Sequence, residues 1–471
     1  MRHLLSTLAL SILCGSAAGN YANALDDLPT IGDPINRVLT SREEYQLGQA
    51  LLTRLRHELP IVEDIELNYY LNNLGARLLS HAGASAFPFH FLILDSPVIN
   101  AFAAPGGIIV VHTGLINLAR NEDELAGVLA HEIAHVTQRH LARFYQKSSK
   151  MDLGATLGII AAIIASANSA AAGQAALYAG LAANASAKLA FTRANEREAD
   201  RIGRMTLEKS GFDPNAMGRF FERLRDASMV NEETALEFLQ THPLPSARIA
   251  DQLTFDRKHP EPEESGSKDS LDFALFRARA QGLSQALPQQ SDRGNRKDWV
   301  IFARATQLLN NTRPEDALKA LRSLSKAWRN SFGVRLLVAR AELKNHNTQA
   351  ALRALENLVQ TWPDNPAAIE ALANAYLDAG KPKKAYDLLT LKSALTHRWL
   401  PLLKLKAAAA SRAGKQAVSH ATMASYYLRM GLPSAAMAQV EIAERLPATS
   451  EVNRAKLELL KKRIKKAAEN K

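Results

Sequence analysis

The stretch from Gly127 to His140 reads GVLAHEIAHVTQRH and holds residue types that can do chemistry. His131 and His135 are four residues apart, so on a helix their imidazoles share one face and can bind one metal ion. Glu132 is about 100° around the helix axis, near enough to hold a water on that ion and accept its proton. A zinc ion lowers the pKa of such a water to about 7, so the spacing predicts metal-assisted hydrolysis. The alternative for this motif alone is an ordinary helix whose histidines face solvent.

A metal site of this kind needs a third protein ligand. Metzincins place a glycine three residues and a histidine six residues after the second histidine. The chain has Gln138 and Leu141 at these positions, which excludes that class. His140 follows His135 by five residues, a step that rotates it off the ligand face, so we expect His140 at the surface.

The candidate for the third ligand lies in an acidic segment at 193–203, which reads RANEREADRIG. Glu196 and Asp200 are one helical turn apart, which suits a glutamate ligand and an aspartate that orients a ligand imidazole. Glu198 points elsewhere on such a helix, and we expect it at the surface. Without the two histidines, a solvated acidic face would be the default interpretation of this segment.

A further histidine occurs in the stretch LQTHPLPSARIADQL. Pro243 and Pro245 place His242 on a rigid non-helical loop, and Arg248 begins a new helix. Alone, His242 would be incidental. Beside a His-Glu metal site it can serve as a fourth ligand or as a donor to the tetrahedral oxyanion.

The flanking sequence predicts the elements that must position these side chains. Asn121 and Glu124 form a capping-box pattern that begins the helix of the two histidines. Upstream, Phe89–Asp95 and Ile108–His112 are strand-like, and the segment between them, 100–107, reads NAFAAPGG. An exposed strand edge beside the metal-binding helix can pair with an extended peptide backbone.

The sequence from residue 273 onwards is helical and repeats every 34 residues. Three sets of positions keep this step: Ala317, Ala351 and Ala385; Trp328 and Trp362; Gly380 and Gly414. The period is that of tetratricopeptide helix hairpins, in which a small alanine lets the second helix approach the first. A further unit at 431–436 is out of step, so the register slips near Lys415. Stacked hairpins of this kind normally form a concave surface that binds other proteins.

Composition and the N-terminal sequence set the compartment. The chain has 471 residues, of which 47% are hydrophobic and 22% charged, enough for two or three domains. Its formal net charge of +11 favours acidic partners or anionic surfaces and does not by itself indicate nucleic acid. Met1 to Ala24 reads as a secretory signal, with cleavage predicted before Leu25. Cys14 is the only cysteine, so the processed chain has no thiol ligand; lipid attachment at Cys14 is the alternative.

The segment 153–190 is almost free of charge. Its strongly apolar part, 157–167, is shorter than the roughly 20 residues that a helical membrane span needs. We expect a helical hairpin that covers the catalytic site or touches a membrane surface peripherally. A transmembrane hairpin is the alternative.

Four motifs together resemble the M48 family of peptidases, which are zinc-dependent gluzincins. They are HEIAH at 131–135, EREADRIG at 196–203, NAFAAPGG at 100–107 and THP at 241–243, with Arg248 shortly after. The resemblance covers nearly the whole chain after the signal when the repeats are included.

The resemblance implies one zinc ion per chain and a role for each motif residue. His131, His135 and Glu196 would bind the ion. Asp200 and Arg248 would not bind it but would contact and orient these ligands. Glu132 would be the catalytic base. His242, the second catalytic candidate, can occupy the open position of the metal in this family and hold the enzyme latent.

The resemblance also implies a cellular role. Family members with a signal peptide and tetratricopeptide repeats are periplasmic enzymes of Gram-negative bacteria. They degrade stalled outer-membrane proteins, assist the assembly of these proteins, and associate with the barrel-assembly machinery through the repeats. Composition and spacing alone support only the peptidase chemistry and the protein-binding repeats. We expect no nucleic-acid partner.

We therefore expect a mainly α protein with two functional parts. A gluzincin-type α+β metallopeptidase domain with a small sheet spans 25–257, after a signal peptide at 1–24. A linker at 258–272 leads to an α-solenoid of tetratricopeptide repeats at 273–471. Two alternatives remain: a protein-binding or chaperone module with a latent metal site, and an integral membrane protease.

Overall fold

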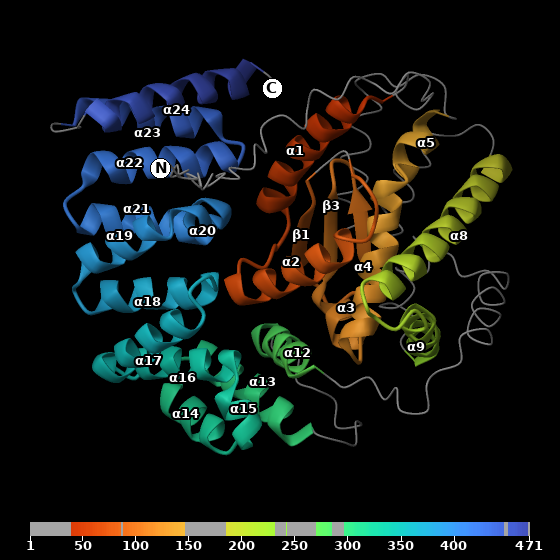
Figure 1. The fold of residues 1–471 in the computed structure, drawn as a ribbon, viewed down its shortest axis with the longest axis horizontal. Helices are drawn as coiled ribbons and strands as arrows, with labels where there is room; N and C mark the ends of the chain where they lie inside the picture. The colour runs from red at the N-terminus through yellow and green to blue at the C-terminus, as the bar shows by residue number, and fades with distance from the viewer. Residues whose placement is uncertain are drawn as a thin grey trace, which may run out of the picture.

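The computed structural model describes residues 39–85, 88–146, 185–230, 242, 270–284, 296–446 and 451–469. Figure 1 shows two parts side by side: a helix-and-strand part, coloured red to yellow-green, and a stack of helices coloured green to blue. In the described ranges most residues are helical and three strands form one sheet. The predicted fold class, a small-sheet peptidase part followed by a helical repeat array, is confirmed.

The sheet contains β1 (His90–Leu94), β2 (Ala101–Ala104) and β3 (Ile108–His112) in the order β1-β3-β2. β1 runs parallel to β3, whereas β2 runs antiparallel to β3 after a tight turn at Gly106 and Gly107, where φ is +73° and +80°. The sequence predicts only a connection at 100–107. It misses β2 because alanine, which fills three of the four positions of this strand, has a weak strand preference.

Helices cover both faces of the sheet. The helices of this part are α1 (Ser41–Glu58), α2 (Ile65–Leu79), α3 (Thr113–Leu118), α4 (Glu122–Thr137), α5 (His140–Gln146), α8 (Ala185–Lys209) and α9 (Ala216–Val230). α1 packs on one face, where Leu51 and Leu55 meet Val110 of β3. α2 and α4 pack on the other face, in a core that includes Leu71 and Leu129. The strands are therefore buried on both sides, and α4 is held rigidly against the sheet.

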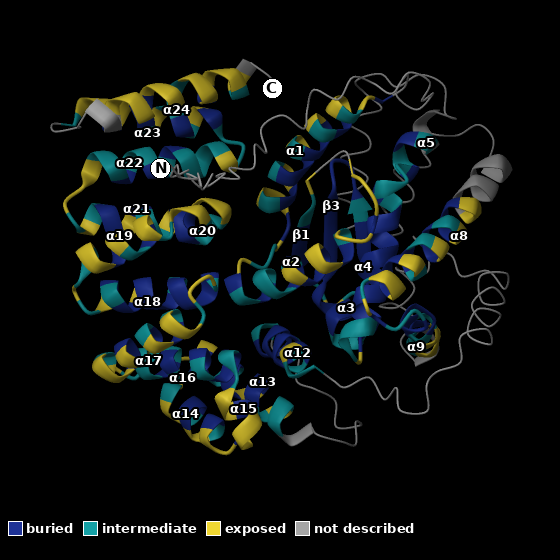
Figure 2. Cartoon of the chain, in the orientation of Figure 1, coloured by how far each residue is buried: buried dark blue, intermediate teal, exposed yellow. Residues whose placement is uncertain are grey.

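The repeat part is a stack of antiparallel helix hairpins. Its helices are α12 (Leu271–Leu283), α13 (Arg296–Asn310), α14 (Pro314–Arg322), α15 (Lys326–Asn330), α16 (Phe332–Lys344), α17 (Thr348–Thr361), α18 (Pro366–Asp378), α19 (Pro382–Leu391), α20 (Ser393–Arg398), α21 (Leu400–Arg412), α22 (Gln416–Arg429), α23 (Pro433–Arg445) and α24 (Glu451–Glu469). Ala317, Ala351 and Ala385, which define the 34-residue step, are fully buried in the second helix of successive hairpins. In the stack, the buried residues lie on the helix faces that pack against neighbouring helices (Figure 2).

The turns inside the hairpins keep the same period. A positive φ recurs at positions 34 residues apart: Thr312 (57°), His346 (62°), Gly380 (68°) and Gly414 (75°). The next left-handed turn, at Gly431 (72°), comes only 17 residues after Gly414, which confirms that the register slips in this region. Glycine marks the later turns in the sequence, but Thr312 and His346 carry no such sign because both have side chains that disfavour this backbone conformation.

The two parts are joined by buried charges and by a shared helix. Arg279 of α12 donates to both carboxylate oxygens of Asp64 at 3.1 and 2.7 Å, and its Nε is 3.1 Å from Glu66. Arg340 of α16 reaches Glu66 from the repeat side at 3.2 Å. Phe276 of α12 lies in the core of the peptidase part, so α12 belongs to the packing of both parts.

Several predictions fall on residues outside the described ranges. They are the signal at 1–24 with Cys14 and the cleavage before Leu25, the apolar segment up to residue 184, Arg248, and the linker up to residue 269. In the described part of the chain, no helix is both long and apolar enough to cross a membrane. The spanning alternative for 153–190 therefore stays a prediction, as do the domain boundaries.

Candidate metal centre

The helix that carries His131 and His135 begins at the predicted cap, Asn121, but only one half of the predicted capping box is formed. The side chain of Asn121 accepts a hydrogen bond from the Glu124 N–H at 2.9 Å and caps α4. The Glu124 carboxylate is engaged elsewhere, because it accepts from Arg120 N–H at 2.8 Å and pairs with Arg223 at 2.6 Å. This buried pair ties the start of α4 to α9.

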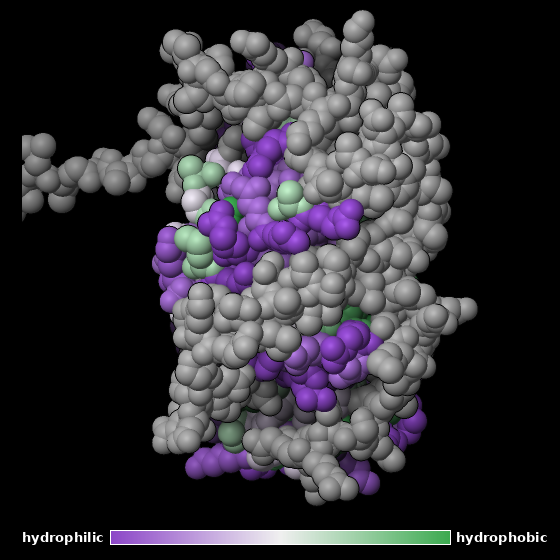
Figure 3. Space-filling model, turned by 90° about the vertical axis from the view of Figure 1, so that its right-hand side faces the viewer, coloured by the Kyte–Doolittle hydropathy of each residue, from purple (hydrophilic) through white to green (hydrophobic). Residues whose placement is uncertain are grey.

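The acidic segment at 193–203 lies on α8, which packs directly along α4. A glycine makes the approach possible: a Cβ on Gly203 would lie 2.8 Å from Met217 Cε and 3.2 Å from His131 N. The inner face of α8 carries Glu196 and Asp200, which are 3% and 5% exposed. On the side of the molecule turned away from the repeats, the described residues at the surface are mainly hydrophilic (Figure 3).

Four side chains that the sequence singles out meet at one point. One ligand atom of each of His131, His135, Glu196 and His242 lies within 4.8 Å of the others. His131 Nε2 is 3.1 Å from His135 Nε2 and 3.4 Å from Glu196 Oε2. His135 Nε2 is 3.4 Å from Glu196 Oε1. Two nitrogens from α4 and a carboxylate more than sixty positions further along the sequence thus face one another across a space that one cation can occupy.

His242 enters the same cluster from a segment far along the chain. Its Nδ1 is 3.3 Å from His131 Nε2 and 3.1 Å from Glu196 Oε2, and its Nε2 is 3.4 Å from Glu132 Oε1. The residue is 7% exposed. The position lets His242 act as a fourth ligand, one of the two roles that the sequence leaves open.

Each of the two α4 histidines has a partner behind it. His131 Nδ1 lies 3.0 Å from Asp200 Oδ1, which directs Nε2 of the same ring towards the cluster. His135 Nδ1 lies 2.9 Å from His140 Nδ1, and His140 Nε2 lies 3.2 Å from Glu198 Oε2. Arg143 donates to the same Glu198 oxygen at 2.9 Å. A neutral His140 that donates from Nε2 to Glu198 can accept from His135 Nδ1–H, which leaves His135 Nε2 free for a metal.

The expectation that His140 lies at the surface is wrong, whereas Glu198 keeps 28% of its side chain exposed and lies at the edge of the site. The expectation for His140 assumes that α4 continues past Gln138, but α4 ends at Thr137 and Arg139 adopts φ +51°. This left-handed residue turns the chain back, so His140 begins α5 only 4% exposed and beside His135. Arginine gives no sequence sign of a left-handed turn, and we find no local signal that would have placed His140 correctly.

The electrostatics of the cluster favour a cation. Burial alone would lower the pKa of His131, but hydrogen bonds with Asp200 and Glu196 and the charges of both carboxylates outweigh it and raise this pKa to about 10. Burial opposes ionisation of Glu196 as well, yet the neighbouring histidines hold its pKa well below its ordinary value. The site therefore presents an ionised carboxylate and a second one behind His131 in a buried setting, a combination that a divalent ion neutralises.

Glu132 completes the arrangement as a buried carboxylate. It is 0% exposed, and among the described residues no hydrogen-bond donor satisfies either of its oxygens. A buried carboxylate without a hydrogen-bond donor lowers the stability of the fold, so its presence here indicates a functional role. Its oxygens remain available for a proton or a water in the cluster.

This geometry defines a class: a metallopeptidase in which two histidines on one helix, a glutamate on a second helix and a free glutamate face one space, fused to helical repeats. The model of Peptidase family M48 matches residues 66–254, and a tetratricopeptide repeat model matches residues 342–394. The chain belongs to the M48 family, in the group with tetratricopeptide repeats, and is a metalloendopeptidase.

Individual relatives agree with this assignment. The beta-barrel assembly-enhancing protease of Escherichia coli (strain K12) is 32% identical over 399 residues, which cover 82% of this chain and 81% of that protein. A putative beta-barrel assembly-enhancing protease of Vibrio cholerae is 37% identical over 276 residues, 58% of this chain and 56% of that protein. A mitochondrial metalloendopeptidase of Schizosaccharomyces pombe is 34% identical over 191 residues, 38% of this chain and 50% of that protein. The similarity to the Escherichia coli protein spans most of both chains.

Proposed function

We propose that the chain is a zinc endopeptidase in which His131, His135 and Glu196 hold one zinc ion. The observation that carries the proposal is that ligand atoms from these side chains lie within 4.8 Å of one another in a buried site. Two imidazole nitrogens and one carboxylate oxygen are a ligand set of catalytic zinc, which keeps a further position for water or substrate. Asp200 and, through His140, Glu198 would orient the two imidazoles.

When bound, the zinc ion would supply a Lewis acid that polarises the scissile carbonyl and activates a water. Glu132 would accept the proton of that water and pass it to the leaving amine. Its oxygens accept no hydrogen bond from the described residues, and the His242 Nε2 that lies 3.4 Å from Oε1 belongs to the residue that would move away for cleavage. His131 would keep its proton on Nδ1, where Asp200 lies, so that its Nε2 lone pair points inwards.

His242 would hold this enzyme latent. Its Nδ1 lies among the ligand atoms, 3.1 Å from Glu196 Oε2, so it would take the coordination position that a substrate needs. Cleavage would then require the segment around His242 to move aside.

We further infer that the enzyme acts in the periplasm on outer-membrane proteins and associates with the barrel-assembly machinery through its repeats. The names of the bacterial relatives support this inference, and so does the predicted signal at 1–24. The repeats supply the protein-binding surface that such a role needs. Degrading misassembled proteins and assisting assembly both fit a peptidase with a separate client-binding part.

The proposal is tested with the Glu132→Gln variant. Purified wild-type protein loaded with zinc should cleave a destabilised outer-membrane protein, and Glu132→Gln should cleave it about 100-fold more slowly or worse, because the base is lost. Glu222→Gln, at an exposed glutamate of α9, is the matched control and should cleave normally. Equal rates for Glu132→Gln and wild type would contradict the proposal. If Glu132→Gln loses proteolysis but sustains every cellular role, the binding or chaperone alternative is the main function.

A further inference from the structure

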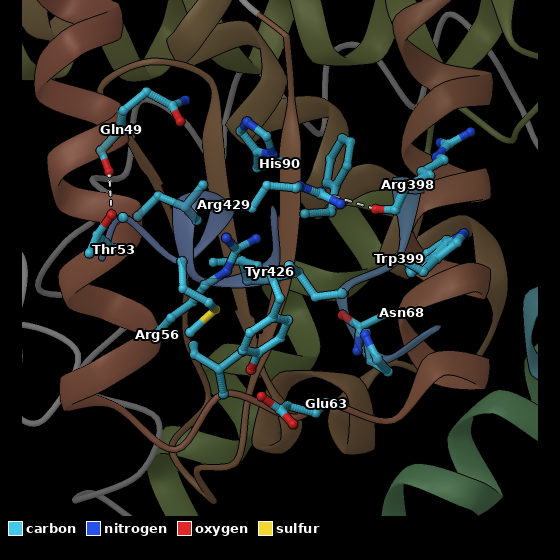
Figure 4. A pocket seen from close by; sticks show the side chains of 18 of the residues that line it. Gln49, Thr53, Arg56, Glu63, Asn68, His90, Arg398, Trp399, Tyr426 and Arg429 are labelled. Carbon is cyan, nitrogen blue, oxygen red and sulfur yellow. Dashed lines mark hydrogen bonds between the residues drawn. The ribbon is translucent and has the colours of Figure 1, made fainter. Parts of the chain in front are cut away.

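The peptidase part and the repeats enclose a cavity of about 910 Å³ that is separate from the metal centre. The residues that line it come mainly from the outer edge of β1, from α1 and α2, and from α20, α21 and α22. Figure 4 shows the side chains of several of these residues pointing into the cavity. The closure depends on a turn of the repeats: a Cβ on Gly431 would lie 2.2 Å from Thr53 Oγ1 of α1. None of the described residues that line the cavity belongs to the metal cluster.

The lining is strongly cationic. Five basic side chains and one acidic side chain, Glu63, line the cavity; the basic residues are Arg54, Arg56, Arg398, Lys404 and Arg429. Arg54 is paired with Glu58 at 2.8 Å, so the other four supply the positive charge. Arg56 of α1 and Arg429 of α22 approach from opposite parts of the molecule, and both lie near His90 in Figure 4. Arg429 is fixed there because its guanidinium donates to the His397 and Arg398 carbonyls at the end of α20.

The basic groups in this cavity repel one another. Burial and then the charge of Arg429 lower the pKa of Arg56 to about 10. Burial and then both arginines lower the pKa of His90 to about 4. Arg56 and Arg429 line the same cavity, so a carboxylate that enters it can accept hydrogen bonds from guanidinium groups there and reduce their repulsion.

At the outer edge of β1, the Phe91 N–H has no hydrogen-bond partner among the described residues. His90 N–H donates to Gly107 O of the neighbouring strand at 2.9 Å, so the N–H of Phe91, the next residue, points away from β3. Further along β1 the outer edge is covered, because Val62 N–H donates to Ile93 O at 2.8 Å. At Phe91 O the only donor among the described residues is the Asn72 amide, at a long 3.4 Å. The edge is therefore open at Phe91, where it faces the cavity.

Apolar and aromatic groups lie beside this open edge. Phe89, Leu400 and Trp399 line the cavity together with the edge residues. The Trp399 indole nitrogen is buried and finds no acceptor among the described residues. An open strand edge, an apolar wall and an unused donor match an extended polypeptide better than an inorganic anion, which would use only the charges.

We propose that this cavity binds an extended acidic segment of a protein partner, which pairs with β1 at Phe91 and places a side-chain carboxylate between Arg56 and Arg429. The site lies between the two parts, so the bound segment bridges the peptidase and the repeats. This inference goes beyond the proposed function: it concerns binding, at residues that take no part in hydrolysis.

The test is a binding measurement on the full chain. The probe is a fluorescent peptide that alternates valine and glutamate, acetylated at the N-terminus and amidated at the C-terminus. It should bind, whereas the glutamine counterpart and a version N-methylated on its central backbone amides should bind about tenfold more weakly or worse, because one removes the charge and the other the strand pairing. Because the measurement is of binding and not of cleavage, its failure leaves the proposed peptidase function untouched.

Variants assign the binding to the cavity. Arg56→Gln should weaken binding of the glutamate peptide about tenfold, Arg56→Lys should restore part of it, and Arg353→Gln, at an exposed arginine of α17, should leave it unchanged. Thermal unfolding of each variant checks that the fold is intact.

The proposal is overturned by equal affinity for the glutamate and glutamine peptides, or by equal losses in Arg56→Gln and Arg353→Gln. It is also overturned if the N-methylated peptide binds as well as the unmodified one. A further probe is the glutamine peptide with a free C-terminus. If it binds only because of its terminal carboxylate, the cavity recognises a chain end and not an acidic side chain, which also contradicts the proposal. The proposal is also contradicted if the protein binds phosphatidylglycerol vesicles through Arg56 and does not bind the peptide.

Discussion

Replacing His140 by alanine should weaken zinc binding without unfolding the protein. His140 is 4% exposed and lies 2.9 Å from His135 Nδ1, opposite the nitrogen that faces the metal cluster. The substitution removes the acceptor that keeps the His135 proton on Nδ1, and it frees the imidazole to rotate. Loss of such a partner typically costs 10- to 100-fold in metal affinity, which corresponds to about 1.4 to 2.8 kcal/mol.

A milder change separates orientation from charge. In the wild type, His140 Nε2 lies 3.2 Å from Glu198 Oε2. Glu198→Gln keeps an oxygen that can accept a hydrogen bond from His140 Nε2–H but removes the negative charge. We expect a loss of zinc affinity smaller than that of His140→Ala. The control is His57→Ala, at an exposed histidine of α1, which should bind zinc as the wild type does.

The assay is equilibrium competition for zinc with a chromophoric chelator near neutral pH, together with thermal unfolding of the metal-free proteins. The account requires that His140→Ala holds zinc more weakly and that His57→Ala does not. If a folded His140→Ala protein binds zinc as tightly as the wild type, His140 plays no part in positioning His135. If Glu198→Gln weakens binding more than His140→Ala, the order of the contacts is wrong.

Three further predictions concern the rest of the chain. Arg279→Met should lower the free energy of unfolding by about 3–5 kcal/mol in chemical denaturation, since it leaves the buried carboxylates of Asp64 and Glu66 without their shared partner; a loss below about 1 kcal/mol would show that the pair matters little. Gly431→Val should increase amide hydrogen exchange in α1, because the added side chain meets Thr53 at a left-handed turn, and unchanged exchange there would contradict the close contact. His242→Ala should raise the initial rate of client cleavage, whereas an unchanged or lower rate would argue against latency.

Local sequence patterns predicted those features that depend on short-range geometry. The four-residue spacing of His131 and His135 determines their shared helix face, and Asn121 marks the start of α4. The 34-residue period of Ala317, Ala351 and Ala385 predicted the repeat hairpins, and these alanines are buried as expected. In each case, the relevant partner lies within one helix or one repeat.

Features that depend on tertiary packing could not be predicted in this way. The contact between Asp64 and Arg279 joins residues 215 positions apart, and neither carries a local sign of the other. His140 was misplaced because one left-handed residue, Arg139, redirects the chain after α4. The cavity above Phe91 arises only where the repeats lie against α1, so no single segment encodes it.

The central claim is that side chains from α4 and α8 together bind one zinc ion. The most direct measurement is X-ray diffraction from crystals of the purified protein, collected on both sides of the zinc absorption edge. We expect one anomalous peak per chain, within coordination distance of His131 Nε2, His135 Nε2 and a Glu196 oxygen. A peak at another place, or no peak in protein purified without chelators, would contradict the claim.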